Sequence, residues 1–344
     1  MTKEESINNI EQKPHLFILG AGATKACIPN GDKNKLPSPV MEGFLKTIGQ
    51  EDILSGVTLK TSSSNIESIY SELYERSEYT AKVKEIEDII VRHFSSMQIP
   101  DEPTLYDYLI LSLRCKDCIA TFNWDPLLTQ AYLRVRKITD DLPQLVFLHG
   151  NVAIGLCKEC YTFSPLSFPY CPKCHRKLEE MPLLYPVKDK SYTQHWGIKG
   201  SWTTFEHYIE KAAIVTIWGY GAPESDVKAK EMMLKAFSSS YRKLDQIEVI
   251  DIADPRKTAD KWENFSKETN YHIKVVKSLS ETLLWEFPRR SVEGYVKRNI
   301  TGWWGNSKLF LKEGMSWDEV ELLFQPLLEQ EDNNHFSVIY LCRD

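Results

Sequence analysis

Short runs of apolar residues alternate along the chain with longer segments of helical spacing. The runs lie at 15–19, 118–122, 145–148, 212–218, 247–252 and 272–276. Most are followed directly by glycine or polar residues. Mainly apolar runs of this length predict strands that are buried on both faces of a sheet. With helical segments between them as crossover connections, the pattern predicts an α/β fold with a doubly wound, Rossmann-like parallel sheet.

Helical spacing dominates two further regions of the chain. Between residues 40 and 115, Ser64 and Glu67 form a capping-box pattern, in which each side chain accepts a hydrogen bond from the backbone N–H of the other residue. Helical and strand-like patterns also follow residue 286. We therefore expect one domain over 15–285, with a helical insertion at 40–115, and a small C-terminal appendage over 286–344.

The composition is that of an ordinary globular protein. Of 344 residues, 42% are hydrophobic and 26% are charged, so the chain can bury a large core without disulfide staples. The net charge of −6 gives no general attraction to nucleic acid or to an anionic membrane. Residues 1–14 lack the pattern of a signal peptide, and no apolar stretch is long enough to span a membrane. We expect a cytoplasmic protein.

Four of the eight cysteines form two Cys-x2-Cys pairs that are separated by ten residues. The four are Cys157, Cys160, Cys171 and Cys174. Two such pairs supply a closed, tetrahedral four-sulfur site, which is structural because no position remains open for a catalytic water. The spacing predicts a zinc ribbon over 156–178. Cys115 and Cys118 have no second pair, and we interpret them as buried thiols.

A glycine turn follows the first apolar run. It comprises Gly20, Ala21, Gly22, Ala23 and Thr24, directly before a predicted helix. Such a turn lets backbone N–H groups and a helix N-terminus approach a diphosphate closely. The third glycine of the usual dinucleotide-binding pattern is missing, so a plain turn between strand and helix explains the residues almost equally well.

Polar and glycine residues follow four of the predicted strands. They are Asn123 and Asp125, then His149, then Gly219 and Tyr220, and finally Asp251 and Asp254. Ligands of open α/β sheets bind outside the carboxyl ends of the strands, where these residues should converge. Taken singly, the Asn and Asp residues are also typical of turns and helix caps, and a lone histidine is often a buried structural residue.

With these motifs in this order, the chain resembles the sirtuin family, and more closely its divergent bacterial branch of NAD-hydrolysing defence proteins. The resemblance spans about residues 15–280. The matching segments are Gly20–Thr24 with Ile28–Pro29, Thr121–Asp125, His149–Gly150, the cysteine quartet, Gly219–Asp226 and Asp254–Pro255.

The resemblance implies a role for each candidate residue at the reacting end of NAD. Asn123 would hold the ribose hydroxyls and the attacking water, and His149 would act as the base. Asp125 would bind the carboxamide or preserve the geometry of the loop that carries Asn123.

The remaining candidates would bind the rest of the dinucleotide. The turn from Gly20 to Thr24 would cradle the diphosphate. Asp251 or Asp254 would accept hydrogen bonds from the adenosine ribose. The loop after the 212–218 strand would supply further contacts from four residues: Gly219, Tyr220, Ser225 and Asp226.

Two departures from the sirtuin pattern favour plain NAD hydrolysis over deacylation. Asn30 and the residues after it replace the usual Pro-Asp-Phe-Arg, and Phe122 stands where the family has glutamine before its Asn. The alternatives are an NAD-dependent protein-lysine deacylase and a non-catalytic sensor of NAD or ADP-ribose. The ribbon also carries basic and aromatic residues, but the acidic balance of the chain disfavours a nucleic-acid module.

A hydrolase of free NAD would harm its own cell. We therefore expect that self-assembly or a regulatory protein partner restrains the activity until a trigger arrives. Trp303, Trp304 and Trp317 in the appendage are either anchors of such an interface or core residues.

Overall fold

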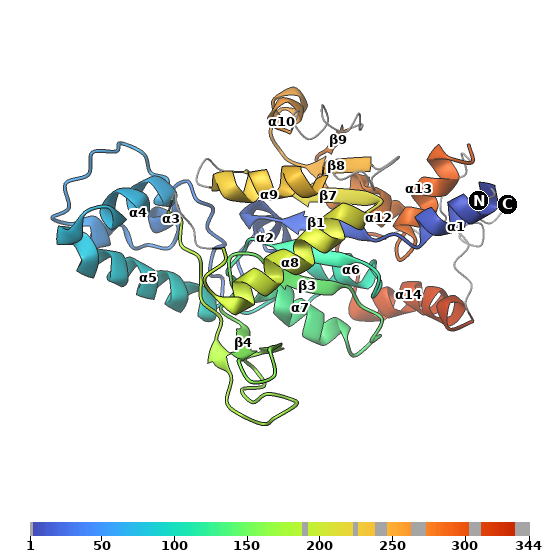
Figure 1. Cartoon of the computed structure of the whole chain (residues 1–344), viewed down its shortest axis with the longest axis horizontal. Helices are drawn as coiled ribbons and strands as arrows, with labels where there is room; N and C mark the ends of the chain where they lie inside the picture. Colours follow the sequence, from blue (N-terminus) through green and yellow to red (C-terminus); the bar gives the residue numbers. More distant parts are fainter. Residues whose placement is uncertain are drawn as a thin grey trace.

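The computed structural model describes residues 3–187, 192–222, 226–237, 246–262, 273–302 and 311–333. Its centre is a six-stranded sheet in the order β3-β2-β1-β7-β8-β9, and all neighbouring strands are parallel (Figure 1). The strands are β1 (His15–Leu19), β2 (Cys118–Thr121), β3 (Gln144–Phe147), β7 (Ile214–Trp218), β8 (Gln246–Ile250) and β9 (Ile273–Val276). In chain order the sheet reads 3-2-1-4-5-6, which is the doubly wound order of Rossmann folds. The predicted fold class is confirmed.

Both faces of the sheet are buried, as the apolar runs predict. Along β1, Phe17 and Leu19 face one hydrophobic cluster, and Leu16 and Ile18 face the other. The first cluster contains residues of α2 (Ala21–Cys27), α6 (Leu105–Leu111) and α7 (Leu127–Val135). The second contains residues of α8 (Trp196–Lys211) and α9 (Val227–Phe237), and Trp262 at the end of α10 (Pro255–Lys261).

A group of helices between β1 and β2 forms one end of the molecule (Figure 1). It contains α3 (Phe44–Thr47), α4 (Ile66–Tyr74) and α5 (Thr80–Ser95), with short 3-10 helices at Glu51–Leu54 and Ser77–Tyr79. The predicted capping box is wrong in its first residue. Asn65 caps α4 by accepting the N–H of Glu67 at 2.9 Å. The hydroxyl of Ser64 instead donates to Glu42.

Helices from both termini form the opposite end of the molecule (Figure 1). They are α1 (Lys3–Glu11), α12 (Leu283–Glu286), which follows a 3-10 helix at Leu279–Glu281, α13 (Ser291–Asn299) and α14 (Trp317–Asp332). A capping box of Ser316 and Glu319 starts α14. The buried side chain of Arg289 lies 2.7 Å from both Glu331 of α14 and Asp141. Helix α14 also packs against the main core, because Phe324 belongs to the same hydrophobic cluster as Phe17 and Leu19 of β1.

A small antiparallel sheet follows His149 and projects from the main body (Figure 1). Its strands are β4 (Ile154–Cys157), β5 (Thr162–Pro165) and β6 (Glu179–Glu180), in the order β5-β4-β6. Close packing of Gly197 in α8 against Leu156 in β4 joins it to the main body, since a Cβ at Gly197 would lie 2.9 Å from the leucine Cδ1.

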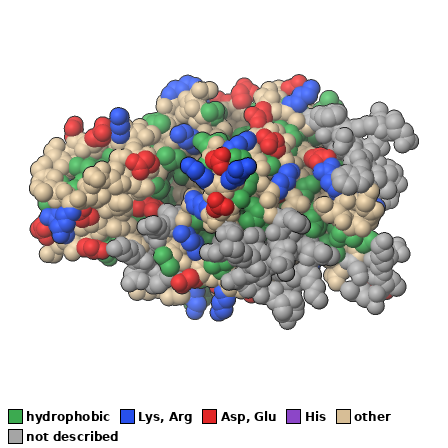
Figure 2. Space-filling view, turned by 90° about the horizontal axis from the view of Figure 1, so that it is seen from above, with side chains coloured by type: hydrophobic (Ala, Val, Ile, Leu, Met, Phe, Trp, Pro, Cys, Tyr) green, Lys and Arg blue, Asp and Glu red, His purple; other side chains and the backbone are tan. Residues whose placement is uncertain are grey.

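The surface carries charges of both signs. On the face in Figure 2, basic and acidic side chains of the described residues are interspersed rather than gathered by sign. This mixture matches the modest net charge of the chain. Among the described residues, no helix has the length and apolarity needed to cross a membrane.

Candidate functional site

A cavity of about 850 Å³ opens at the carboxyl ends of the parallel strands. From β1 the chain continues to β2 and β3 on one side of the sheet, and from β7 it continues to β8 and β9 on the other side. The topological switch point of the sheet therefore lies between β1 and β7. Such crevices are the usual ligand sites of doubly wound sheets, and the volume suits a cofactor-sized ligand. Ten predicted site residues line the cavity: Gly20, Ala21, Gly22, Asn123, Asp125, His149, Gly219, Tyr220, Asp226 and Asp251.

Three glycines bring the ends of β1 and β7 into direct backbone contact. A Cβ at Gly20 would lie 2.6 Å from the carbonyl oxygen of Gly219, and one at Gly22 would lie 2.8 Å from the Gly219 Cα. Gly219 itself has a φ of +65°, and its Cβ would lie 2.3 Å from the nitrogen of Ala23. No larger residue fits this junction, so the glycines are needed for packing whether or not a phosphate binds.

The N–H groups of the turn are partly used by this junction. Gly20 donates to the carbonyl of Trp218, and Gly22 donates to the carbonyl of Gly219, both at 3.0 Å. Ala21 is the first residue of α2, where an N–H has no acceptor within the helix, and it lines the cavity. Ala21 is therefore the donor that the start of the turn can offer to a ligand.

The side chain of Asn123 is held in one orientation. Its Nδ2 donates to the carbonyl of Gly20 and to Oγ1 of Thr24, both at 2.9 Å, and lies 3.4 Å from the hydroxyl of Tyr106. A carbonyl can only accept, so the nitrogen must face Gly20. Oδ1 then remains as an acceptor without a protein donor in the described part of the chain. Asn123 therefore presents a fixed acceptor at the cavity.

Thr24 and Asp125 form the support beneath Asn123. The Thr24 hydroxyl donates to Oδ2 of Asp125 at 2.8 Å and lies 2.7 Å from the Tyr106 hydroxyl. The N–H of Leu127 donates to Oδ1 of Asp125 at 3.1 Å. Burial raises the pKa of Asp125, and the Thr24 hydrogen bond opposes that rise. Both carboxylate oxygens have protein partners, which favours a structural role for Asp125 over contact with a carboxamide.

His149 lies in a largely aromatic surround. Its ring makes an edge contact with Phe122 at a centroid distance of 4.8 Å. Its Nε2 lies 3.5 Å from the hydroxyl of Tyr192 and 3.7 Å from Oδ1 of Asp226. The side chain of Asn151 donates to the backbone carbonyls of Asn123 and Asp125 at 3.2 and 2.7 Å, so the loops that carry Asn123 and His149 are joined.

The other predicted residues lie elsewhere. Ala23 and Thr24 are buried behind the turn and do not line the cavity. Asp254 is exposed outside the cavity and caps α10, where it accepts the N–H groups of Arg256 and Lys257. Of the two alternatives for the adenosine ribose, only Asp251 lines the cavity. Ser225 lies outside the described residues.

Sequence reasoning missed Tyr106, Lys25 and Glu67. Tyr106 occupies an apolar position of α6, where an aromatic residue is indistinguishable from core. Lys25 lies one residue beyond the glycine turn and lines the cavity, as does Glu67 of α4. Among the described residues Lys25 has no ion-pair partner, so its charge is available to an anionic ligand. Its position in the first turn after Gly-x-Gly is the signal that could have indicated it.

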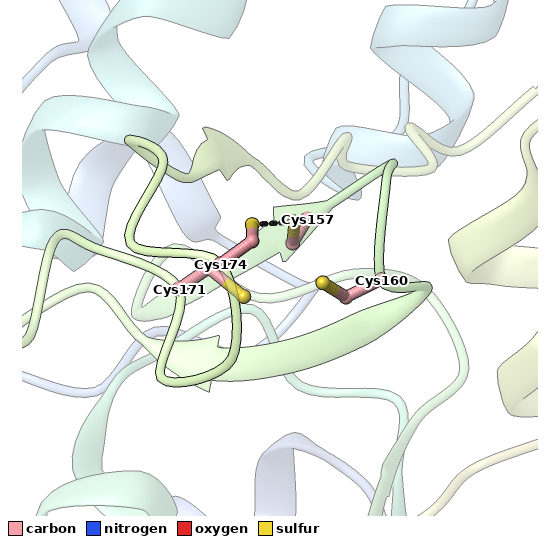
Figure 3. Close-up of side chains that lie close together, drawn as sticks. All are labelled: Cys157, Cys160, Cys171 and Cys174. Atoms are coloured by element: carbon pink, nitrogen blue, oxygen red, sulfur yellow. Dashed lines mark hydrogen bonds between the residues drawn. The ribbon is translucent and has the colours of Figure 1, made fainter.

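The cysteine quartet forms one cluster in the small sheet (Figure 3). All four sulfurs lie within 4.8 Å of one another, and those of Cys157 and Cys174 are 3.5 Å apart. Tetrahedral zinc with Zn–S bonds of about 2.3 Å needs sulfurs roughly 3.8 Å apart, so the cluster fits that ion. The backbone N–H of Cys174 lowers the pKa of Cys171, whereas the hydrogen bond with the Cys174 thiol raises the pKa of Cys160, so the four sulfurs titrate together. The cluster is compatible with a zinc ribbon.

Comparison with known proteins gives likeness to solved structures only. No protein-family model matches the chain, and no curated protein matches it. The similar solved structures include Sir2 bound to an acetylated peptide, with 11% identity and a TM-score of 0.38, over 87% of this chain and 98% of the other. A complex of Sir2 with a peptide and NAD+ has 11% identity and a TM-score of 0.36, over 88% and 100%. These neighbours are sirtuins.

Proposed function

We propose that the chain hydrolyses NAD to nicotinamide and ADP-ribose in the cavity at the strand ends. One observation carries the proposal: Asn123 offers a fixed acceptor in the same cavity that His149 lines, and Asn151 joins their two loops. A fixed acceptor and a base are what the attack of water on a ribose carbon requires.

The proposed reaction breaks the bond between C1′ of the ribose and the nicotinamide nitrogen. Nicotinamide leaves as a neutral molecule and keeps both electrons of that bond, so no general acid is needed. Oδ1 of Asn123 accepts a hydrogen bond from a ribose hydroxyl or from the attacking water. As the water oxygen bonds to C1′, His149 takes the proton, which later passes to solvent. Ala21 and Lys25 are the groups proposed to face the diphosphate.

The environment of His149 supports hydrolysis over deacylation. Only 6% of its surface is exposed, and Phe122 occupies the position of the sirtuin glutamine and packs against its ring. Phe122 also stacks on Tyr220 at a centroid distance of 4.1 Å. A water molecule needs far less room beside the imidazole than an acyl-lysine does, so a crowded, aromatic wall is consistent with water as the acceptor.

We further propose that the cysteine quartet holds one structural Zn²⁺. Four sulfur ligands leave the ion no open position, so it would stabilise the small sheet and take no part in the reaction. Regulation by self-assembly or by a partner, in a defence setting, remains part of the proposal because unrestrained NAD hydrolysis would deplete the host cell.

Release of nicotinamide from NAD, with and without an acetyl-lysine peptide, tests the proposed reaction. Hydrolysis predicts equal release in both samples, since water is the only co-substrate. Release that requires the peptide would instead establish a deacylase. Binding of NAD in calorimetry with no release in either sample, at protein concentrations from nanomolar to micromolar, would favour a sensor.

A further inference from the structure

Asp226 is a buried carboxylate beside the imidazole of His149. It is 2% exposed, it lies just before α9, and its Oδ1 is 3.7 Å from Nε2 of His149. Its Oδ2 accepts a hydrogen bond of 2.8 Å from the hydroxyl of Tyr220. The distance to His149 exceeds that of a hydrogen bond, so the contact is electrostatic and gains strength when the imidazole is protonated.

Asp226 lies within ion-pair distance of His149, and the hydroxyls of Tyr192 and Tyr220 border the same pair. Burial raises the pKa of the Tyr192 and Tyr220 hydroxyls, so both phenols stay neutral. Glu67 and Asp125 also line the cavity, and the carboxylate oxygens of Asp125 accept hydrogen bonds from other residues. Because the surround is aromatic and buried, a single charge acts there with little screening by solvent.

We propose that Asp226 is the positioning residue of His149 in the proposed hydrolysis and does not bind NAD itself. The inference rests on the proposed function. Tyr220 fixes the carboxylate by hydrogen bonding, and the carboxylate orients the imidazole and stabilises the imidazolium. When water attacks C1′, its proton moves to His149, and the new positive charge forms beside Asp226. The proton then leaves to solvent, so neither residue is changed after turnover.

Asp226→Asn removes the charge with little change of volume. We expect kcat/KM for NAD to fall on the order of 10- to 100-fold, a part of the roughly 10²- to 10⁴-fold that a general base contributes. The acidic limb of the pH profile should move to lower pH, because an imidazole without its carboxylate loses its proton more readily. KM should change little. Asp260→Asn, which makes the same replacement on the exposed face of α10, should leave rate and profile unchanged.

A titration of the imidazole by NMR tests the pairing without any activity. In ¹³C-histidine-labelled protein, with the resonance assigned by His149→Gln, the midpoint should fall by about 1 pH unit in Asp226→Asn. It should rise in Tyr220→Phe, because the carboxylate loses the O–H that partly neutralises it. Opposite shifts in the two variants distinguish charge pairing from a general disturbance of the fold. If one variant fails to fold, the shift in the other still tests the pairing.

The results separate the two proposals. Unchanged midpoints in both folded variants would overturn the role of Asp226, even in an active enzyme. The predicted shifts in a protein that never releases nicotinamide would sustain the pairing and contradict the hydrolase. A large rise in KM for Asp226→Asn with unchanged kcat would overturn the inference in favour of direct NAD contact.

Discussion

Thr24 is the last residue of the glycine turn and is almost fully buried. Its hydroxyl is where three groups that are distant in sequence meet: the side chains of Tyr106, Asn123 and Asp125. Its place within a candidate phosphate loop suggested contact with NAD, whereas its hydrogen bonds support the residue that we propose to contact NAD. The distinction matters because a support residue affects the rate through geometry alone.

Thr24→Val keeps the shape of the side chain and removes its hydroxyl. Asp125 and Tyr106 would then be left with unsatisfied buried groups, and we expect a loss of about 1–3 kcal/mol in the free energy of unfolding. The rate of nicotinamide release should also fall, because Asn123 loses a hydrogen-bond partner that fixes its orientation. Thr24→Ser retains the hydroxyl and should keep most of the stability and most of the rate of nicotinamide release. A valine variant as stable and as active as the wild type would contradict this account.

His15 lies at the opposite end of β1 and has no link to the cavity. Both ring nitrogens have hydroxyl partners at 2.8 Å, Ser291 and Thr216. Burial, with a smaller contribution from Lys116, lowers the pKa of His15 from 6.5 to about 3. The folded chain thus holds a neutral imidazole at a pH where the unfolded chain would protonate it.

This difference makes stability depend on pH. Since the folded pKa is the lower one, the contribution of His15 is complete above pH 6.5 and is lost as the pH falls toward about 3. In that window the slope from this residue approaches 1.4 kcal/mol per pH unit, as an order of magnitude. Urea unfolding of His15→Gln across the window should show a shallower slope than the wild type. Parallel slopes would refute the assignment.

At the scale of elements, hydrophobic patterning accounts for most of the sheet. The apolar runs became the six parallel strands because burial on both faces favours mainly apolar sequence. The close junction of β1 and β7 could not be predicted in the same way. Gly20 and Gly219 are about two hundred residues apart, and only the strand order makes them neighbours. Ser64 failed as a cap for a local reason, since Asn65 offers an equally good oxygen one residue later.

Gly219→Ala tests that junction. The added Cβ would stand 2.3 Å from the Ala23 nitrogen in a backbone conformation with a φ of +65°. We expect a loss above about 2 kcal/mol, from left-handed strain together with displacement of the turn. Gly221→Ala is the matched control two residues later, because among the described residues its Cβ would meet only the Lys261 Nζ, at 3.7 Å. Similar unfolding curves for the two variants would show that the junction is not tightly packed.

At the scale of the whole molecule, the small sheet depends on its cysteines. Its own buried cluster has only Leu178 besides Cys157 and Cys171, with three partly buried neighbours, which is too little to fold alone. The Cys-x2-Cys spacing predicted the cysteine cluster directly, because the ligands of a metal ribbon are close together in the sequence. The cavity was less predictable, since Lys25 and Glu67 reach it, and Tyr106 reaches the support behind Asn123, only through the packing of α2, α4 and α6.

Removal of one ligand should release the metal. We expect about one zinc per chain in the wild type, by atomic spectrometry of dialysed protein, and a large loss in Cys171→Ser. The melting temperature should fall as the small sheet loses its order. Cys115 is exposed, so its interpretation as a buried thiol is wrong, whereas Cys118 is buried as predicted. Because Cys115 lies outside the cluster, Cys115→Ser should retain both the zinc and the melting temperature. Wild-type protein free of zinc, or full zinc in Cys171→Ser, would contradict the ribbon.

The most direct test of the central claim is nicotinamide release from NAD, without peptide, by wild-type protein and by Asn123→Ala. We expect the wild type to release nicotinamide and the rate to fall roughly 100-fold or more in Asn123→Ala, which is the usual effect of removing a polar group that acts in the transition state. The circular dichroism spectrum and melting temperature of the variant should show that it is folded. A folded Asn123→Ala protein that releases nicotinamide at the wild-type rate would contradict the account.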